Sequence, residues 1–180
     1  MGDREHIVVA LDGDAKMSEH VIAWCAKMKI LKENHKITFL HVAEYHTVSY
    51  VTAADLGAFA SSSVTSPRIN AAMKKLAVDK GSEFLQDCSR KASSHGIKPD
   101  ELKLLIANQG TSVKSCIKNY LEKHNASAVV CGSRGLSAIS RAFIGSVSDY
   151  LAHYASCATI IIKPPREWLG KSVPVVERRR

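Results

Sequence analysis

The sequence has no apolar run long enough to cross a bilayer. A membrane-spanning helix needs roughly 20 consecutive apolar residues, whereas the first apolar run covers only residues 7–11 and no later run approaches that length. The first run is also too short for the core of a secretory signal peptide. We therefore expect a protein with no membrane-spanning segment and no membrane partner.

Cysteine pairs at metal-site or redox spacing are also missing. Five cysteines occur, an odd number, and no two of them are separated by only two residues. Each lies in an apolar periodic segment, as small buried hydrophobic residues do. Unpaired thiols of this kind are typical of a reducing compartment, so we expect a cytoplasmic location.

Sequence signatures of phosphoryl transfer and of dinucleotide binding are absent. There is no G-x4-G-K-[ST] motif, so the lysine that P-loop enzymes place on the phosphates is missing, and there is no GxGxxG fingerprint. No local motif supports a Ser-His-Asp arrangement either. We therefore predict no catalytic residues.

The chain is basic, but its pattern differs from that of nucleic-acid-binding modules. Its 25 Lys and Arg exceed its 17 Asp and Glu, which gives a net charge of +8, and part of the excess lies in residues 165–180. A basic body suits an anionic ligand. Aromatic residues are not interleaved with basic ones, so we expect no nucleic-acid partner.

Residues 1–164 are predicted to form one α/β domain, and residues 165–180 a basic C-terminal tail.

Five short apolar segments alternate with segments of helical periodicity. The apolar segments are rich in Val, Ile and Leu without polar alternation, which is the pattern of strands buried on both faces of a parallel sheet. Strands alternating with helices predict a five-stranded parallel sheet, doubly wound with helices on both faces. The predicted strands are residues 7–11, 37–42, 102–107, 128–131 and 158–162. The apolar stripe of the second predicted helix is Ile69, Met73, Leu76, Phe84, Leu85 and Cys88.

A glycine-punctuated loop follows the fourth predicted strand and leads into a helix. It reads Gly132-x2-Gly135-x9-Gly145-Ser146. Glycines let backbone N–H groups approach phosphate oxygens without an intervening Cβ atom. The helix that begins near Ser146 adds unpaired N–H groups and the positive end of its dipole, while the Arg134 side chain can pair with a phosphate. The loop therefore predicts a phosphate-binding site.

The spacing of this loop resembles the nucleotide-binding signature of the universal stress protein family. The segments IVVALDG, HVAE, SAVVCGSRG and IGSVSDYLAHYASCATIIIK extend the resemblance over most of the chain. It implies a Rossmann-like sheet of order 3-2-1-4-5 that binds ATP or AMP, with Asp12 on the nucleoside side and the backbone of Val42 on the adenine. The implied binding residues are Ala10, Asp12, Val42, Cys131, Gly132, Arg134, Gly135, Gly145, Ser146, Val147 and Ser148.

Two features depart from the family pattern. Asp14 stands where the family often has serine after Asp-Gly. A second carboxylate there would either help Asp12 to bind Mg²⁺ or repel phosphates, and Asp14 also competes with Ser18 as the N-cap of the first helix. The polar stretch 43–66 is longer than compact members require and is predicted to be an extended loop. A lid, an interface and a disordered insertion remain open alternatives for it.

The resemblance also implies a homodimer, because family members often pair through their last strand, here Ala158–Ile162. We expect a nucleotide-binding stress-response or signalling module with slow or no hydrolysis. Two alternatives remain open. One is a dimeric interaction module that acts without nucleotide, and the other is a weak Mg²⁺-dependent ATPase that uses Asp12.

Overall fold

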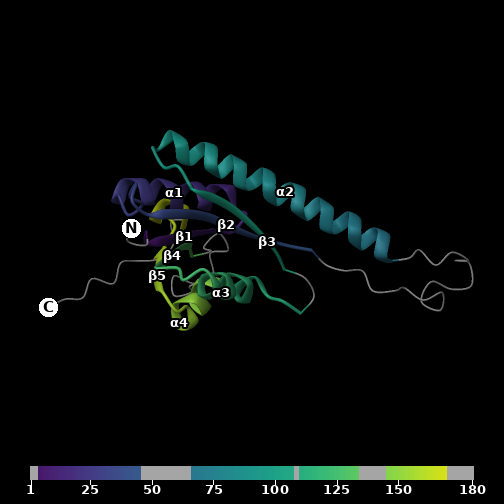
Figure 1. Cartoon of the computed structure of the whole chain (residues 1–180). Coiled ribbons are helices and arrows are strands. Elements are labelled where there is room, and N and C mark those ends of the chain that lie inside the picture. Colours follow the sequence, from purple (N-terminus) through teal and green to yellow (C-terminus); the bar gives the residue numbers. More distant parts are fainter. Residues whose placement is uncertain (1–3, 46–65, 108–109, 134–144, 170–180) are drawn as a thin grey trace, which may run out of the picture.

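The computed structural model describes residues 4–45, 66–107, 110–133 and 145–169. Strands and helices alternate along the chain as the sequence predicts (Figure 1). The elements are β1 (His6–Leu11), α1 (Ala15–Met28), β2 (Lys36–Glu44), α2 (Ser66–Ser94), β3 (Glu101–Ala107), α3 (Val113–Lys123), β4 (Ala128–Gly132), α4 (Ser146–Tyr154), β5 (Ala158–Ile162) and the 3₁₀ turn η1 (Arg166–Leu169).

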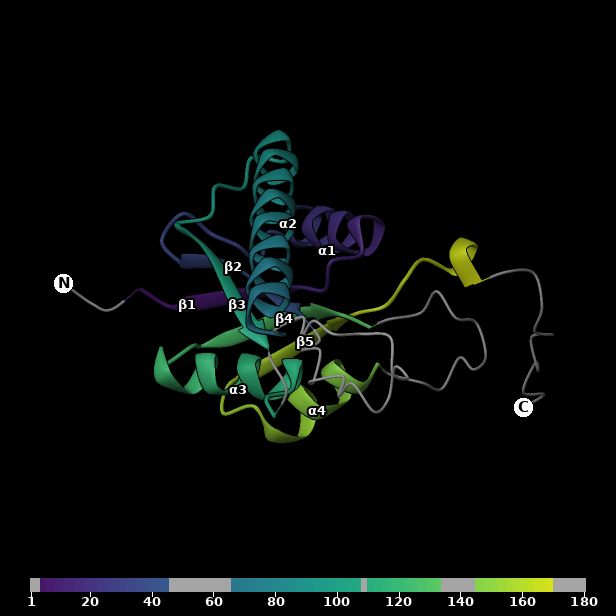
Figure 2. The same ribbon diagram turned by 90° about the vertical axis from the view of Figure 1, so that its right-hand side faces the viewer.

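All five strands are parallel and follow the order β3-β2-β1-β4-β5. The predicted fold class and strand order are therefore confirmed. Figure 2 shows α1 and α2 on one face of the sheet and α3 and α4 on the other. The central strands are buried on both faces because their side chains point alternately into two hydrophobic cores. In β1, Val9 lies in the core on the α1–α2 side and Val8 in the core on the α3–α4 side.

The N-terminus of α1 is set by Asp14. Its carboxylate accepts a hydrogen bond from the Met17 N–H at 2.8 Å, which satisfies one of the unpaired donors of the first turn. Ser18, the competing candidate, lies inside the helix and is buried. At α3 the cap is Ser112, whose hydroxyl accepts from the Ser115 N–H. Both caps use the short polar side chains that sequence rules favour.

The second strand is longer than its sequence pattern predicts. Ala43 and Glu44 pair with Ile106 and Ala107 of β3, so they belong to β2 and not to the predicted loop 43–66. β2 continues beyond its apolar run, which ends at Val42, because its pairing with the outer strand β3 continues there. Residues 46–65 of the predicted loop lie outside the described residues.

The chain remains packed beyond the predicted domain limit at residue 164. Trp168 of η1 packs against the core between the sheet and α1. The Lys16 ammonium lies 4.2 Å from the centre of its ring, and the ring of His20 lies 5.3 Å away. A cation above an aromatic face is attracted by the ring quadrupole, so these contacts attach the start of the predicted tail to α1. None of the helices in the described ranges is long and apolar enough to cross a membrane.

Candidate functional site

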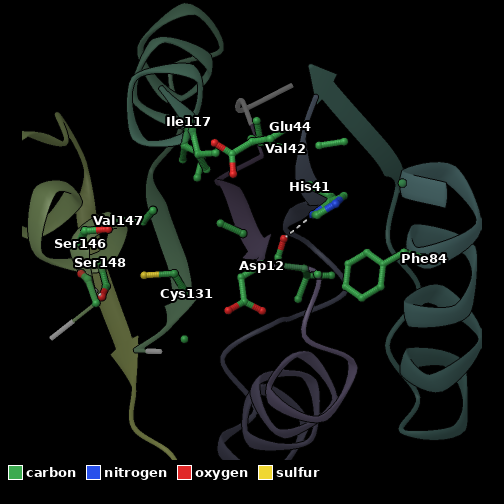
Figure 3. Close-up of a pocket in the computed structure, with 18 of the residues that line it drawn as sticks. Asp12, His41, Val42, Glu44, Phe84, Ile117, Cys131, Ser146, Val147 and Ser148 are labelled. Carbon is green, nitrogen blue, oxygen red and sulfur yellow. Dashed lines mark hydrogen bonds between the residues drawn. The ribbon is translucent and has the colours of Figure 1, made fainter. Parts of the chain in front are cut away.

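A cavity of about 370 Å³ opens at the carboxyl ends of β1, β2 and β4 (Figure 3). Ligands of doubly wound sheets bind at this edge, where the strand order reverses. The sheet order places this reversal between β1 and β4. The lining residues are Ala10, Leu11, Asp12 and Gly13 after β1; His41, Val42, Ala43 and Glu44 of β2; Ala77, Lys80, Gly81 and Phe84 of α2; Val113 and Ile117 of α3; and Cys131, Gly132, Gly145, Ser146, Val147 and Ser148.

Asp12 lies in the tight turn that joins β1 to α1. Its carboxylate accepts a hydrogen bond from the Asp14 N–H at 3.0 Å. Gly13 has a φ of +83°, a left-handed conformation that glycine adopts without steric cost. This turn places Asp12 in the lining of the cavity, between Cys131 and His41 in Figure 3.

His41 connects the ends of β1 and β2 beneath the cavity. Its Nδ1 donates to the Leu11 carbonyl at 2.8 Å, and its ring lies 4.8 Å from the ring of Phe84. Burial lowers the pKa of His41, and the hydrogen bond to Leu11 and the charge of Asp12 oppose that shift only in part. At neutral pH the imidazole is therefore uncharged, and its single N–H holds the backbone immediately before Asp12.

Acidification is predicted to destabilise the fold through His41. Because the folded state lowers its pKa from the ordinary 6.5, the unfolded chain takes up the proton more readily. The contribution of the neutral His41 to the unfolding free energy is thus complete above the ordinary pKa of 6.5. It is lost as the pH falls through the lower pKa of His41 in the folded state. Urea titrations between about pH 8 and pH 5 should show a smaller loss of unfolding free energy in His41→Gln than in the unchanged protein. Equal losses in the two proteins would assign the acid sensitivity to other groups, such as His124.

The N-terminus of α4 faces the cavity without a side-chain cap. Gly145 occupies the cap position, and no side chain there accepts a hydrogen bond from the first turn. The Ser148 hydroxyl donates to the Gly145 carbonyl at 2.9 Å, so this predicted binding residue already uses its hydroxyl hydrogen within the protein. Backbone N–H groups at a helix start, with the positive end of the dipole behind them, suit an anion such as phosphate.

Gly132 has a packing role that its place in the glycine motif does not reveal. A Cβ atom on Gly132 would lie 2.8 Å from Cε and 2.9 Å from Cγ of Met17, a buried residue of α1. Its missing side chain therefore makes room for α1. Next to it, burial and the charge of Asp12 raise the pKa of the Cys131 thiol to about 12, so this cysteine lines the cavity as an uncharged group.

Nine of the eleven predicted binding residues line the cavity. They come from four separate segments of the chain, which the fold brings to one edge of the sheet. Arg134 and Gly135 lie outside the described residues. Asp14 does not line the cavity, because its carboxylate caps α1. The second carboxylate of the lining is instead Glu44, at the end of β2.

One wall of the cavity comes from α2 and was not predicted from the sequence. Ala77, Lys80, Gly81 and Phe84 follow the i, i+3, i+4, i+7 spacing of one helix face. A Cβ on Gly81 would lie 2.7 Å from Cδ1 of Leu104, so this glycine allows α2 to approach the sheet closely. An isolated glycine inside a helical pattern is a known sign of such packing, and it was the available signal.

A preformed metal centre is not found in the described part of the chain. No group of three or more His, Cys, Asp or Glu side chains is placed there to hold an ion. Magnesium commonly needs only one or two carboxylates when phosphates of a ligand complete its coordination. A single carboxylate such as Asp12 fits Mg²⁺ when the phosphates of a nucleotide supply further ligands.

The model of the universal stress protein family matches residues 3–163. A universal stress protein of Synechocystis sp. is 30% identical over 81 residues, which are 45% of this chain and 49% of that protein. The chain thus spans about half the length of this curated relative, and 22% of a universal stress protein of Arabidopsis thaliana.

Two solved structures share the fold. A universal stress protein of Archaeoglobus fulgidus in complex with dAMP is 19% identical, with 91% of this chain and 100% of that chain covered and a TM-score of 0.54. A family protein of Arabidopsis thaliana with AMP bound is 21% identical, with 91% and 94% covered and a TM-score of 0.54.

Proposed function

The chain belongs to the universal stress protein family, and we propose that it binds an adenine nucleotide, ATP or AMP, in the cavity at the carboxyl edge of its sheet. The observation that carries this proposal is the uncapped N-terminus of α4, which opens into the same cavity as the ends of β1 and β2. Helix N–H groups suit the phosphates at one end. The complexes of related proteins with AMP and dAMP support the choice of ligand.

We propose that the adenine base binds at the end of β2. β2 pairs with β1 only as far as Leu11 and His41, whereas it continues beside β3 to Glu44. Val42 and the two residues after it therefore extend past the end of β1, with one edge of the strand toward the cavity. Backbone N–H and C=O groups on such an edge offer one donor and one acceptor to the edge of a base. Asp12, between the two ends, is placed for the ribose or a phosphate-bound Mg²⁺.

We propose that the protein acts as a stress-response or signalling module with slow or no hydrolysis. A hydrolase requires a positioned water, charge stabilisation and usually a lysine or arginine on the transferred phosphate. The sequence lacks the P-loop motif whose lysine holds the phosphates in many such enzymes. We further propose a cytoplasmic protein, since all five cysteines are free thiols, and a homodimer formed through the open edge of β5.

Native and denaturing mass spectrometry of the purified protein tests this function. We expect the native form to be heavier by the mass of ATP or AMP, and calorimetry of the stripped protein to give micromolar affinity, about −8 kcal/mol. A native dimer that neither retains nor binds a nucleotide would favour the interaction module. Product formed from ATP, and lost in Asp12→Ala, would favour the ATPase.

A further inference from the structure

Glu44 is the outermost residue of the cavity wall at the end of β2. It is held in place by its pairing with Ala107 of β3. Its side chain lies on the same face of β2 as that of Val42, two residues earlier, because side chains alternate along a strand. Figure 3 shows Glu44 beside Val42 and Ile117 and above Asp12, with Ser146 and Ser148 to the left of both carboxylates.

The Glu44 carboxylate is available to a ligand. The residue is exposed at the mouth of the cavity, and within the described ranges it forms no salt bridge or hydrogen bond. Its charge acts on Cys116 of α3, whose pKa is raised first by burial and then by the Glu44 charge. The carboxylate therefore acts on the α3 side of the cavity, next to the strand edge where the base is proposed to lie.

We propose that Glu44 is a specificity-determining residue that selects a base with an exocyclic amino group at position 6, adenine, over one with a carbonyl there. An ionised carboxylate only accepts hydrogen bonds. Adenine offers the 6-amino group as a donor at this edge, whereas hypoxanthine presents an oxygen that the carboxylate repels. Two acceptors that face each other repel, so the discrimination follows from repulsion as well as attraction. This inference rests on the proposed nucleotide binding.

The same charge also orients the ligand. β1 separates β2 from β4 in the sheet, so the ends of β2 and β4 are about 10 Å apart at ordinary strand spacing. Glu44 at one end repels phosphate, while the N-terminus of α4 at the other end attracts it. A nucleotide is therefore favoured in only one of its two directions across the cavity.

Calorimetric titration with AMP, IMP and GMP tests the assignment in the full chain. We expect the unchanged protein to bind AMP at least about 10-fold more tightly than IMP, as one charge-assisted hydrogen bond against a repulsive contact predicts. In Glu44→Gln the amide nitrogen can donate a hydrogen bond to the 6-oxygen of IMP. The preference for AMP over IMP should therefore narrow to about 3-fold or less. The matched control is Glu83→Gln, which removes the same charge from an exposed position of α2 outside the cavity lining.

The outcomes separate this inference from the proposed function. If no nucleotide binds to the unchanged protein, the proposed function fails. If AMP binds but Glu44→Gln keeps the full preference over IMP, or if Glu83→Gln narrows it equally, the function stands and the role of Glu44 is overturned. Tighter binding of GMP than of AMP would also overturn the proposed role of Glu44. Its carboxylate would then accept hydrogen bonds from the N1–H and 2-amino groups of guanine.

Discussion

Gly145→Val should lower the affinity for AMP by at least about 100-fold in a protein that remains folded. Gly145 lines the cavity at the start of α4, so a valine side chain there would occupy the space in which the phosphate meets the helix N–H groups. The backbone tolerates the change, since Gly145 has φ −57° and ψ 151°, an extended conformation open to all residues. Its carbonyl, which accepts from the Ser148 hydroxyl, is kept. A 100-fold loss corresponds to about 2.7 kcal/mol.

Calorimetry with AMP and thermal unfolding of the same samples check this prediction. Gly145→Ala provides a graded control, because a single methyl group should weaken binding less than the branched side chain does. The unfolding temperatures of both variants should stay close to that of the unchanged protein. Binding retained within a few-fold in Gly145→Val would place the phosphate elsewhere.

Gly132→Ala should destabilise the fold by about 1–3 kcal/mol, the usual cost of overpacking a filled core. The added Cβ would lie under 3 Å from two atoms of Met17, which is only 4% exposed. Met17 must then change its rotamer or α1 must shift away from β4. Urea unfolding at a fixed protein concentration measures the loss.

A double variant identifies the cause of this loss. If the clash with Met17 is responsible, Met17→Ala combined with Gly132→Ala should cost less than the sum of the two single changes. Molecules of Gly132→Ala that remain folded should bind AMP with nearly unchanged affinity. Normal stability combined with lost binding would instead show that Gly132 serves the ligand, as the glycine motif predicts.

The fold could be predicted because its signals are local. The runs of β-branched and aliphatic residues in 7–11 and 128–131 became the doubly buried strands β1 and β4, since only such strands exclude polar residues from both faces. The caps Asp14 and Ser112 also follow from short-range chemistry, because a short polar side chain before a helix accepts a hydrogen bond from its first turn.

Longer-range features were predicted less well. The apolar stripe of the second helix included Ile69 and Leu76, yet these residues are 38% and 54% exposed. They lie in the first half of α2, which extends past the edge of the sheet, whereas Leu85 and Cys88 farther along are buried against it (Figure 1). Helical periodicity shows which residues share a face, but it does not show how far along the helix that face is covered.

The glycine-punctuated loop shows both the value and the limit of its motif. Gly145 and Ser146 are placed where the motif predicts, because a loop between a parallel strand and a helix must end at the carboxyl edge of the sheet. Arg134 and Gly135, at its start, lie outside the described residues. Gly132 is constrained by a contact with a residue more than a hundred positions earlier, which no local pattern can indicate.

The sequence by itself determined the parallel α/β fold and, through the family resemblance, its strand order and nine of the residues around the cavity. It did so because strand burial, helix capping and a glycine-rich loop each depend on neighbours along the chain. Only the tertiary structure decided that Glu44 and not Asp14 is the second carboxylate of the cavity, and that α2 forms one of its walls. Those outcomes depend on how far β2 extends past β1 and how closely α2 approaches the sheet, and both are set by packing between segments distant in sequence.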